Sequence, residues 1–449
     1  MTKIGLEIHI QLNTKTKVFC GCPTSGNESP NTRTCEICTG QPGSKPFLNQ
    51  EAINKALKVA LALNCKINNK NFFSRKSYFY PDLAKNYQIT QYELPLAENG
   101  NFMNVNIKRI HLEEDPGALI HKESYCLIDY NRSGIPLIEV VTQPDLKSPK
   151  EAREFIKELI TVLEYLDVYD KKSESTLKAD LNISTTGEKV EIKNVNGLQD
   201  IELALSYEEK RQEKEKVKKQ ETRGWDSNKK ITILQRIKEK ESDYGYIAEP
   251  DLPLIELTKE QINNIKKTIP ELAQDKTSRF TQEYKLSDYD AKVLSKNKNL
   301  SALFEEVSRK VNPKIAASWI TRDIVKQANL TKKRVEDLKI NPTHLIELLS
   351  LYEKKQITDN TAKAILRKLV EEKPFSPEEY VKKQGLTMQS GNKIEEYCEK
   401  AIKENPKAVE EYKKGNEKSL NFLMGHVMKL SNKTANPSEV IKLLKKLIN

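Results

Sequence analysis

The chain opens with a strict alternation of hydrophobic and polar residues, which predicts a β-strand from Ile4 to Leu12. Successive side chains of a strand point to opposite faces, so one face carries Ile4, Leu6, Ile8, Ile10 and Leu12. The other face carries Gly5, Glu7, His9 and Gln11. Gly5 has no side chain, so a ligand or another backbone can approach the strand closely there. A surface strand would show the same pattern, but Glu7 and His9 stand about 7 Å apart along it, and both can bind a metal or contact a phosphate.

A second strand pattern ends in a run of acids. Two apolar residues alternate with His111 and Glu113, so these two polar side chains are expected to point outward together. Glu113, Glu114 and Asp115 then precede a Pro-Gly turn. Exposed acids are ordinarily only solvated, whereas three acids at the end of a strand suit a divalent cation with oxygen ligands. A histidine ligand would suit manganese, or a water-mediated contact, better than magnesium.

A third alternating segment, residues 190–194, places Glu191 and Lys193 on one face. Such a pair is commonly a surface ion pair, but in a phosphate site the lysine could hold a phosphoryl oxygen while the acid holds the metal. Near residue 76, two cations lie among three aromatic residues. This arrangement can stack on a base and hold its phosphate, and it equally fits the rim of a core: Arg75, Lys76, Tyr78, Phe79 and Tyr80.

From about residue 256 the apolar residues are spaced three and four apart, which predicts helices. Helix starts are marked by a capping residue followed by proline and glutamate at Ser376 and Asn436, and earlier at Ser148. The predicted fold class is α+β. A cradle domain with an antiparallel sheet occupies residues 1–255, with a zinc knuckle at 20–38, followed by an all-α domain at 256–374 and an all-α tail domain at 375–449. The charged stretch 208–240 is expected to be a solvated helix and its exit loop.

Four of the seven cysteines lie within nineteen positions: Cys20, Cys22, Cys35 and Cys38. Two close pairs can converge on one tetrahedral ion, and a closed shell of four thiolates is structural because no position is left for substrate. We therefore expect zinc, while four buried free thiols or an iron–sulfur cluster would fit the same spacing. The other three are expected to be core thiols: Cys65, Cys126 and Cys398.

The balance of 75 basic and 64 acidic residues, a net charge of +11, favours a polyanionic partner such as RNA, although a lysine-rich surface is more often merely solvated. No apolar run approaches ~18 residues and no secretory signal is seen, so we expect no membrane span, and the odd number of cysteines indicates a reducing cytosol. The sequence has no Gly-rich phosphate loop and no evident Ser-His-Asp or Cys-His arrangement. A nucleotide would therefore bind in a cleft of carboxylates and metal, and glutaminase activity is not expected.

Motifs in a fixed order along nearly the whole chain resemble one protein family. They include GLEIHIQL, TKTKVFCGC, RKSYFYPDLAKNYQITQYELPL, IHLEEDPG, DYNRSGIPLIEVVTQPD, VEIKNVN, NPKIAASWITRD and ENPKAVEEYKKGNEKSLNFLMGHVMK. Together they resemble the B subunits of the glutamine-dependent aspartyl/glutamyl-tRNA amidotransferases. The related archaeal E-type subunit shares the front half but carries a large extra domain, for which 449 residues leave no room.

The resemblance implies a subunit of a cytoplasmic ligase that forms carbon–nitrogen bonds with glutamine as amido donor. It would convert misacylated Glu-tRNA(Gln), Asp-tRNA(Asn) or both, by phosphorylating the aminoacyl carboxylate with ATP and displacing the phosphate with ammonia. The implied partners are an amidase-type A subunit that supplies ammonia, a small C subunit and the tRNA. The implied cofactors are ATP, Mg²⁺ and a structural Zn²⁺. The alternatives are an E-type subunit that acts on glutamyl-tRNA(Gln) only, and a non-enzymatic zinc-containing RNA-binding scaffold.

Carried over to this sequence, the resemblance implies three sets of site residues. The magnesium ligands would be Glu7, His9, Glu113 and Glu114, the catalytic set adds Lys76 and Glu191, and the zinc ligands would be Cys20, Cys22, Cys35 and Cys38. The pattern of cations and aromatic residues adds an expected ATP contact by Lys76, Tyr78, Tyr80 and Lys193. In the tail, four lysines are expected phosphate contacts for tRNA, although each would equally suit a solvent-facing position: Lys407, Lys413, Lys414 and Lys429.

Three places depart from the usual pattern of the family. Lys178 stands where arginine is common, which removes a bidentate fork. Residues 245–248 replace a stretch that often contains Arg, Phe and Pro, and His426 stands where glutamine is frequent. These departures concern contacts to the tRNA or its acceptor end rather than the metal cleft.

Overall fold

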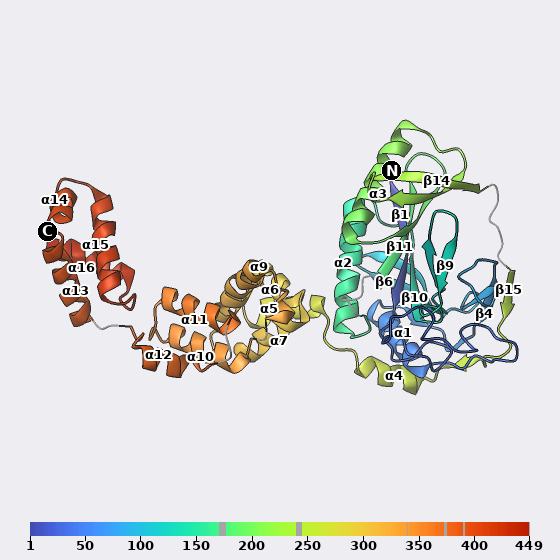
Figure 1. Ribbon diagram of the computed structural model, residues 1–449, viewed down its shortest axis with the longest axis horizontal. Coiled ribbons are helices and arrows are strands. Elements are labelled where there is room, and N and C mark those ends of the chain that lie inside the picture. Colours follow the sequence, from blue (N-terminus) through green and yellow to red (C-terminus); the bar gives the residue numbers. More distant parts are fainter. Residues whose placement is uncertain (170–176, 239–244, 339, 372–374, 389–390, 449) are drawn as a thin grey trace. The chain divides into compact units, whose positions relative to one another are not determined.

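The computed structural model describes residues 1–448 apart from 170–176, 239–244, 339, 372–374 and 389–390 (Figure 1). The chain divides into two compact units, Met1–Glu271 and Leu272–Asn449. The first unit contains the sheets and the second is helical, so the predicted α+β class is confirmed. The predicted boundary between the two helical domains falls on residues 372–374, which lie outside the described residues.

A nine-stranded sheet, counted over the described residues, forms the frame of the first unit in the order β14-β13-β12-β11-β1-β10-β7-β6-β2. Neighbouring strands are antiparallel except β12 and β13, which are parallel, so the predicted antiparallel sheet is a mixed one. The strands are β1 (Lys3–Gln11), β2 (Lys66–Ile67), β6 (Ala97–Phe102), β7 (Val105–Glu114), β10 (Pro136–Thr142), β11 (Leu177–Ser184), β12 (Val190–Val195), β13 (Gln220–Asp226) and β14 (Ile231–Lys238).

β1 lies between β10 and β11, near the middle of this sheet, and its apolar face is covered. The five alternating apolar side chains from Ile4 to Leu12 are at most 2% exposed, as the pattern predicts. Helix α2 packs on β1 and α3 packs on β11 and β12. α2 begins at the predicted cap, because the Ser148 side chain accepts a hydrogen bond from the N–H of Glu151. The helices of the first unit up to β13 are α1 (Gln50–Ala62), α2 (Pro149–Tyr165) and α3 (Leu198–Lys214).

The prediction of a solvated helix and loop for residues 208–240 is wrong beyond the end of α3. Residues 220–226 and 231–238 form the paired strands β13 and β14 at the edge of the sheet, and residues 239–240 lie outside the described part. Glu208 is fully buried, and it pairs with Arg211 and Arg223. Glu221 pairs with the same two arginines, so one cluster of charges in this stretch is neutralised within the fold, which a count of charged residues does not reveal.

Smaller elements complete the first unit. They are the sheet β15-β4-β5 (Gly245–Ala248, Ser74–Ser77, Tyr87–Thr90), the pairs β16-β3 (Ile255–Glu256, Lys70–Asn71) and β8-β9 (Ala118–His121, Cys126–Asp129), and helix α4 (Lys259–Lys267).

The core positions expected for Cys65 and Cys398 are confirmed. The position expected for Cys126 is wrong, because it lies on the two-stranded hairpin, where Tyr125 and Leu127 are also exposed.

The second unit contains two helical cores. The first is built around Phe280, Phe304 and Trp319, and the second around Leu423 and Leu444. No described helix is long and apolar enough to cross a membrane. The first core comprises α5 (Ala273–Glu283), α6 (Asp288–Ser295), α7 (Lys298–Val307), α8 (Pro313–Ser318), η1 (Trp319–Ile324), α9 (Val325–Thr331), η2 (Val335–Asp337), α10 (Pro342–Glu353), α11 (Asp359–Glu371) and α12 (Pro377–Gln384). The second comprises α13 (Gly391–Glu404), α14 (Pro406–Lys413), α15 (Glu417–Leu430) and α16 (Pro437–Ile448).

Candidate active site and metal centres

A cleft of about 470 Å³ opens on the polar face of the large sheet, where β12, β11, β1, β10 and β7 are consecutive neighbours. The alternation that buries Ile8 and Ile10 sends the side chains of His9 and Gln11 into this cleft. Each of the five strands contributes polar side chains: His9 and Gln11 from β1, Glu113 from β7, Glu139 from β10, Lys178 and Asp180 from β11, and Lys193 from β12.

His9, Glu113 and Glu139 form the first group of possible metal ligands, with one donor atom of each within 4.8 Å of the others. The register places His9 directly opposite Glu139, and Glu139 directly opposite His111. His9 Nε2 lies 3.5 Å from the carboxylate of Glu139, and His111 Nε2 lies 3.2 Å from it. The sheet therefore arranges histidine, glutamate and histidine in a row across three strands. His111 and Glu113 share the polar face as predicted, but both are buried, and of the two only Glu113 lines the cleft.

Glu7, Asp180 and Glu191 form the second group, within the same 4.8 Å limit. Glu7 is directly opposite Asp180 in the register of β1 and β11. Lys193 Nζ lies 2.6 Å from Asp180 and 2.5 Å from Glu191, so it neutralises part of the negative charge. Asn182 donates a hydrogen bond to Glu7 at 3.1 Å. This group offers only carboxylate oxygens, the ligand type that Mg²⁺ prefers.

The pKa shifts differ between the two groups. Burial lowers the pKa of His9, but the hydrogen bond to Glu139 and the nearby carboxylates outweigh it and raise this pKa to about 9. In the same way, burial lowers the pKa of His111 while Glu139 and Glu113 raise it to about 8. Against the opposing effect of burial, the two histidines hold the pKa of Glu139 well below its ordinary value. Burial and the charge of Glu139 instead raise the pKa of Glu7.

Basic side chains line the same cleft as these acids. Lys76, on β4, is one of them, and Arg132, Lys178 and Lys193 are the others. Arg132 lies 3.6 Å from Asp115 and donates to the carbonyl oxygen of Pro116 at 2.9 Å. A lining of this kind can hold anionic oxygen atoms on one side and cations on the other.

The structure separates the residues expected to bind magnesium and ATP. Glu7 belongs to one acid group, and His9 and Glu113 belong to the other. Glu114 points away from both and accepts hydrogen bonds from Lys85 Nζ at 2.6 Å and from a backbone N–H at 2.8 Å. Three of the residues expected to contact ATP line the cleft: Lys76, Tyr78 and Lys193. The fourth, Tyr80, is 55% exposed and does not line it.

Sequence reasoning missed Glu139 and Asp180 as possible ligands. Glu139 had one signal, because it is the single charged residue of the strand PLIEVVT, whose positions are all buried. Asp180 lies on the same alternating face as Lys178, but only the pairing of β11 with β1 brings it opposite Glu7.

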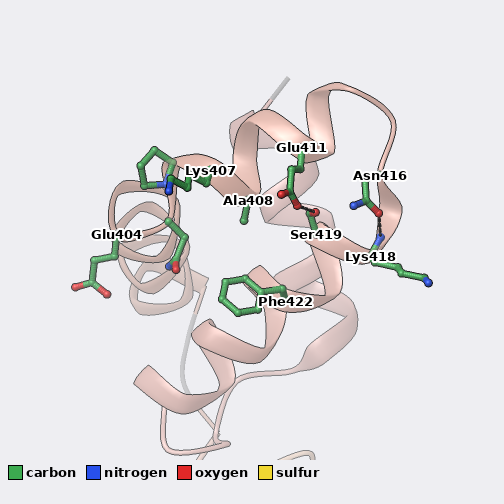
Figure 2. Close-up of a pocket in the computed structure, with 10 residues that line it drawn as sticks. Glu404, Lys407, Ala408, Glu411, Asn416, Lys418, Ser419 and Phe422 are labelled. Atoms are coloured by element: carbon green, nitrogen blue, oxygen red, sulfur yellow. Dashed lines mark hydrogen bonds between the residues drawn. The ribbon is translucent and has the colours of Figure 1, made fainter.

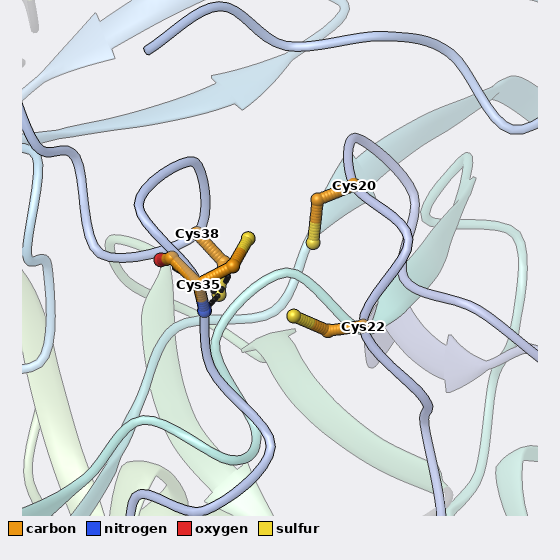
Figure 3. A group of neighbouring side chains, drawn as sticks. All are labelled: Cys20, Cys22, Cys35 and Cys38. Atoms are coloured by element: carbon orange, nitrogen blue, oxygen red, sulfur yellow. Dashed lines mark hydrogen bonds between the residues drawn. The ribbon is translucent and has the colours of Figure 1, made fainter.

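The four clustered cysteines converge as their spacing predicts (Figure 3). Their sulfur atoms lie within 4.8 Å of one another, and those of Cys35 and Cys38 are 4.0 Å apart. Bonds of ~2.3 Å to a tetrahedral zinc would separate the sulfurs by about 3.8 Å, so the cluster fits a four-thiolate centre. A hydrogen bond from Cys20, one from the backbone of Cys35 and the nearby Lys17 outweigh burial and lower the pKa of Cys38 to about 4.

The lysines expected to contact tRNA are all exposed on the tail: Lys407, Lys413, Lys414 and Lys429. Lys407 lines a pocket of about 660 Å³ together with Lys418 and Phe422, whose ring is 58% exposed (Figure 2). Lys413 borders a separate pocket. Of the four predicted lysines, Lys407 is therefore the one that lines the pocket containing Phe422.

Comparison with known proteins gives consistent matches over the chain. Residues 2–263 match the GatB/GatE catalytic domain, and residues 302–448 match the GatB domain. The chain is 44% identical to the B subunit of the aspartyl/glutamyl-tRNA(Asn/Gln) amidotransferase from Thermotoga maritima, over 99% of this chain and 98% of that protein. It is 41% identical to the protein of the same name from Clostridium tetani, over 99% of this chain and 98% of the relative. The chain therefore belongs to the B-subunit family of the aspartyl/glutamyl-tRNA amidotransferases.

Proposed function

We propose that this chain activates the aminoacyl carboxylate in an amidotransferase that converts misacylated Glu-tRNA(Gln) and Asp-tRNA(Asn) to Gln-tRNA(Gln) and Asn-tRNA(Asn). The observation that carries the proposal is the cleft, which is lined by one whole group of metal-binding side chains, by Asp180 of the second group and by four basic side chains. This lining suits the phosphate groups of ATP together with the divalent cations that neutralise them. The groups are His9-Glu113-Glu139 and Glu7-Asp180-Glu191, with Lys76, Arg132, Lys178 and Lys193.

In the proposed reaction, an oxygen of the substrate carboxylate attacks the γ-phosphorus of ATP. The bond from that phosphorus to the bridging oxygen breaks, so ADP leaves and an acyl phosphate forms. Lys76, Lys178 and Arg132 would hold the phosphate oxygens in line with the attack. Ammonia then attacks the acyl carbon, inorganic phosphate leaves, and the amide forms after loss of a proton. Bound divalent cations would supply neutralisation of the phosphate charge.

The chemistry of the donor atoms supports a different metal for each group of ligands. Magnesium suits the all-oxygen group of Glu7, Asp180 and Glu191. The group that contains His9 suits manganese or a water-mediated contact. The four cysteines would hold a structural zinc, because four thiolates leave no open position. ATP would lie near Lys76, Tyr78 and Lys193.

The proposed reaction needs other components. Ammonia would come from an amidase-type A subunit, because no nucleophile arrangement of the glutaminase kind is evident in this sequence. A small C subunit would join the two, and the exposed lysines of the tail would contact the tRNA body. The assembly would work in the cytoplasm. A second candidate, a zinc-containing RNA-binding scaffold, explains the tail and the cysteines but leaves the buried carboxylate groups without a role.

The test is release of γ-phosphate from labelled ATP by this chain with its A and C partners, Mg²⁺ and Glu-tRNA(Gln) or Asp-tRNA(Asn). We expect release that requires a misacylated tRNA, and the tRNA that triggers it names the substrate. Glu139→Gln should reduce release at least ~100-fold, whereas Glu123→Gln, an exposed control with the same charge change, should not. RNA binding without release by the wild type would favour the scaffold.

A further inference from the structure

A fully buried lysine stands beside the cysteine cluster, outside the proposed reaction. Lys17 is 0% exposed, and its Nζ lies 3.5 Å from Sγ of Cys38. The same nitrogen donates a hydrogen bond to the carbonyl oxygen of Tyr130 at 3.2 Å. Within the described part of the chain, Lys17 forms no ion pair with a carboxylate. Of these two partners, the sulfur of Cys38 is the one that can carry a negative charge.

A buried ammonium group is costly unless an anion compensates it. Four thiolates around a divalent cation carry a net charge of −2, and half of the cluster is buried, because Cys20 and Cys38 are 2% and 3% exposed. We propose that Lys17 is the counter-ion of the metal centre and stabilises the bound zinc. This inference rests on the proposed zinc site and adds a residue outside the four ligands.

Lys17 also ties the metal centre to the cleft, through the loop between β9 and β10. Its hydrogen bond to Tyr130 holds the start of this loop, and Ser133 Oγ donates to the carbonyl oxygen of Cys38 at 3.1 Å. Gly134 follows with φ +83°, and an added Cβ there would lie 3.4 Å from Cδ of Lys17. Arg132, which lines the cleft, sits between these anchors. Lys17 therefore also holds the start of the loop that carries Arg132.

The experiment measures zinc retention by the purified full-length chain. Zinc content is determined first, and transfer of zinc to a competing chelator is then followed in wild type, Lys17→Met and Lys15→Met. Lys15 is exposed in the same segment, so its substitution removes an equal charge without touching the cluster. Because partners behind metal ligands typically change affinity 10–100-fold, Lys17→Met should lose zinc at least ~10-fold more readily, and Lys15→Met should stay near wild type. Hydrogen exchange across residues 128–135 should be faster only in Lys17→Met.

The outcomes separate the inference from the proposed zinc site. A wild type without bound zinc would overturn both, whereas zinc-loaded proteins in which Lys17→Met behaves like Lys15→Met would overturn the counter-ion alone. Cys22→His lowers the net negative charge of the cluster from two to one, so the effect of Lys17→Met should shrink in that background. If Lys17→Met does not fold, the Cys22→His double variant should recover zinc-loaded protein. Failure to recover it would reduce Lys17 to a packing role and overturn the proposal.

Discussion

Glu208 on α3 is the centre of a buried ion-pair network that fastens this helix to β13 and β14. Its carboxylate accepts hydrogen bonds from Arg211 at 2.6 and 3.0 Å and from Thr232 at 2.9 Å, and Arg223 lies 3.6 Å away. β13 in turn pairs with β12, the strand that carries Lys193 into the cleft and Glu191 into the second acid group. We predict that Glu208→Gln destabilises the first unit by ~2–3 kcal/mol.

The magnitude follows from the burial of the partners. Breaking a buried ion pair typically costs ~3–5 kcal/mol, because the remaining charge is left uncompensated. The side chains of Arg211 and Arg223 are 13% and 11% exposed, but Glu221 still pairs with both at 2.8 Å, so the loss falls below that range. With an m-value of ~3 kcal/mol per M, the urea midpoint should fall by about 1 M.

The assay is urea unfolding monitored by hydrogen exchange in peptides from β13 and β14, because these peptides report on the first unit. Glu213→Gln is the matched control, because Glu213 lies on the same helix but is exposed, and it should change stability by less than ~0.5 kcal/mol. The reasoning would be refuted if both variants unfolded at the same urea concentration, since the network would then contribute nothing.

Three further predictions concern other parts of the chain. Lys193→Met should abolish tRNA-dependent phosphate release and leave the secondary structure, followed by circular dichroism, unchanged, because it removes the cation shared by two carboxylates; retained release would contradict the site. In the helical unit, Lys276 and Arg279 outweigh burial and lower the pKa of Glu305. The ion pairs of Glu305 therefore stabilise the folded state by ~1 kcal/mol at a pH above the pKa that Glu305 has in the unfolded chain. This stabilisation is lost as the pH falls through the lower pKa that Glu305 has in the folded protein. The gap in urea stability between wild type and Glu305→Gln should therefore narrow below about pH 4.5; a gap that stays constant would contradict this. Ser148→Ala should lower the urea stability of the first unit by ~1 kcal/mol through loss of the α2 cap, and an unchanged midpoint would show that the cap contributes nothing.

The parts of the fold that the sequence predicts are those set by local periodicity. The strand from Ile4 to Leu12, the helices of the second unit and the cap at Ser148 follow from the spacing of apolar residues and from capping chemistry. β13 and β14 could not be predicted because their charges are paired across strands and with α3, and a composition rich in Lys and Glu resembles that of a solvated surface.

The candidate site was predictable only where its residues carry a local signal. Glu7 and His9 stand out by alternation, and the cysteines by their spacing. Glu113 and Glu114 look alike in the sequence, and the pleat of β7 alone sends one to the cleft and the other to Lys85. Asp180 becomes a neighbour of Glu7 only through strand register, which no short sequence window contains.

The row of His9, Glu139 and His111 runs across three neighbouring strands, and its spacing is set by the hydrogen-bonded sheet. The three residues come from segments far apart in the chain, but the loops between those segments do not enter the row. Loops can therefore gain or lose residues without moving these side chains, whereas a slip of one residue in any of the three strands would turn its member of the row toward the helices. The site should thus tolerate length variation in loops and resist it within strands.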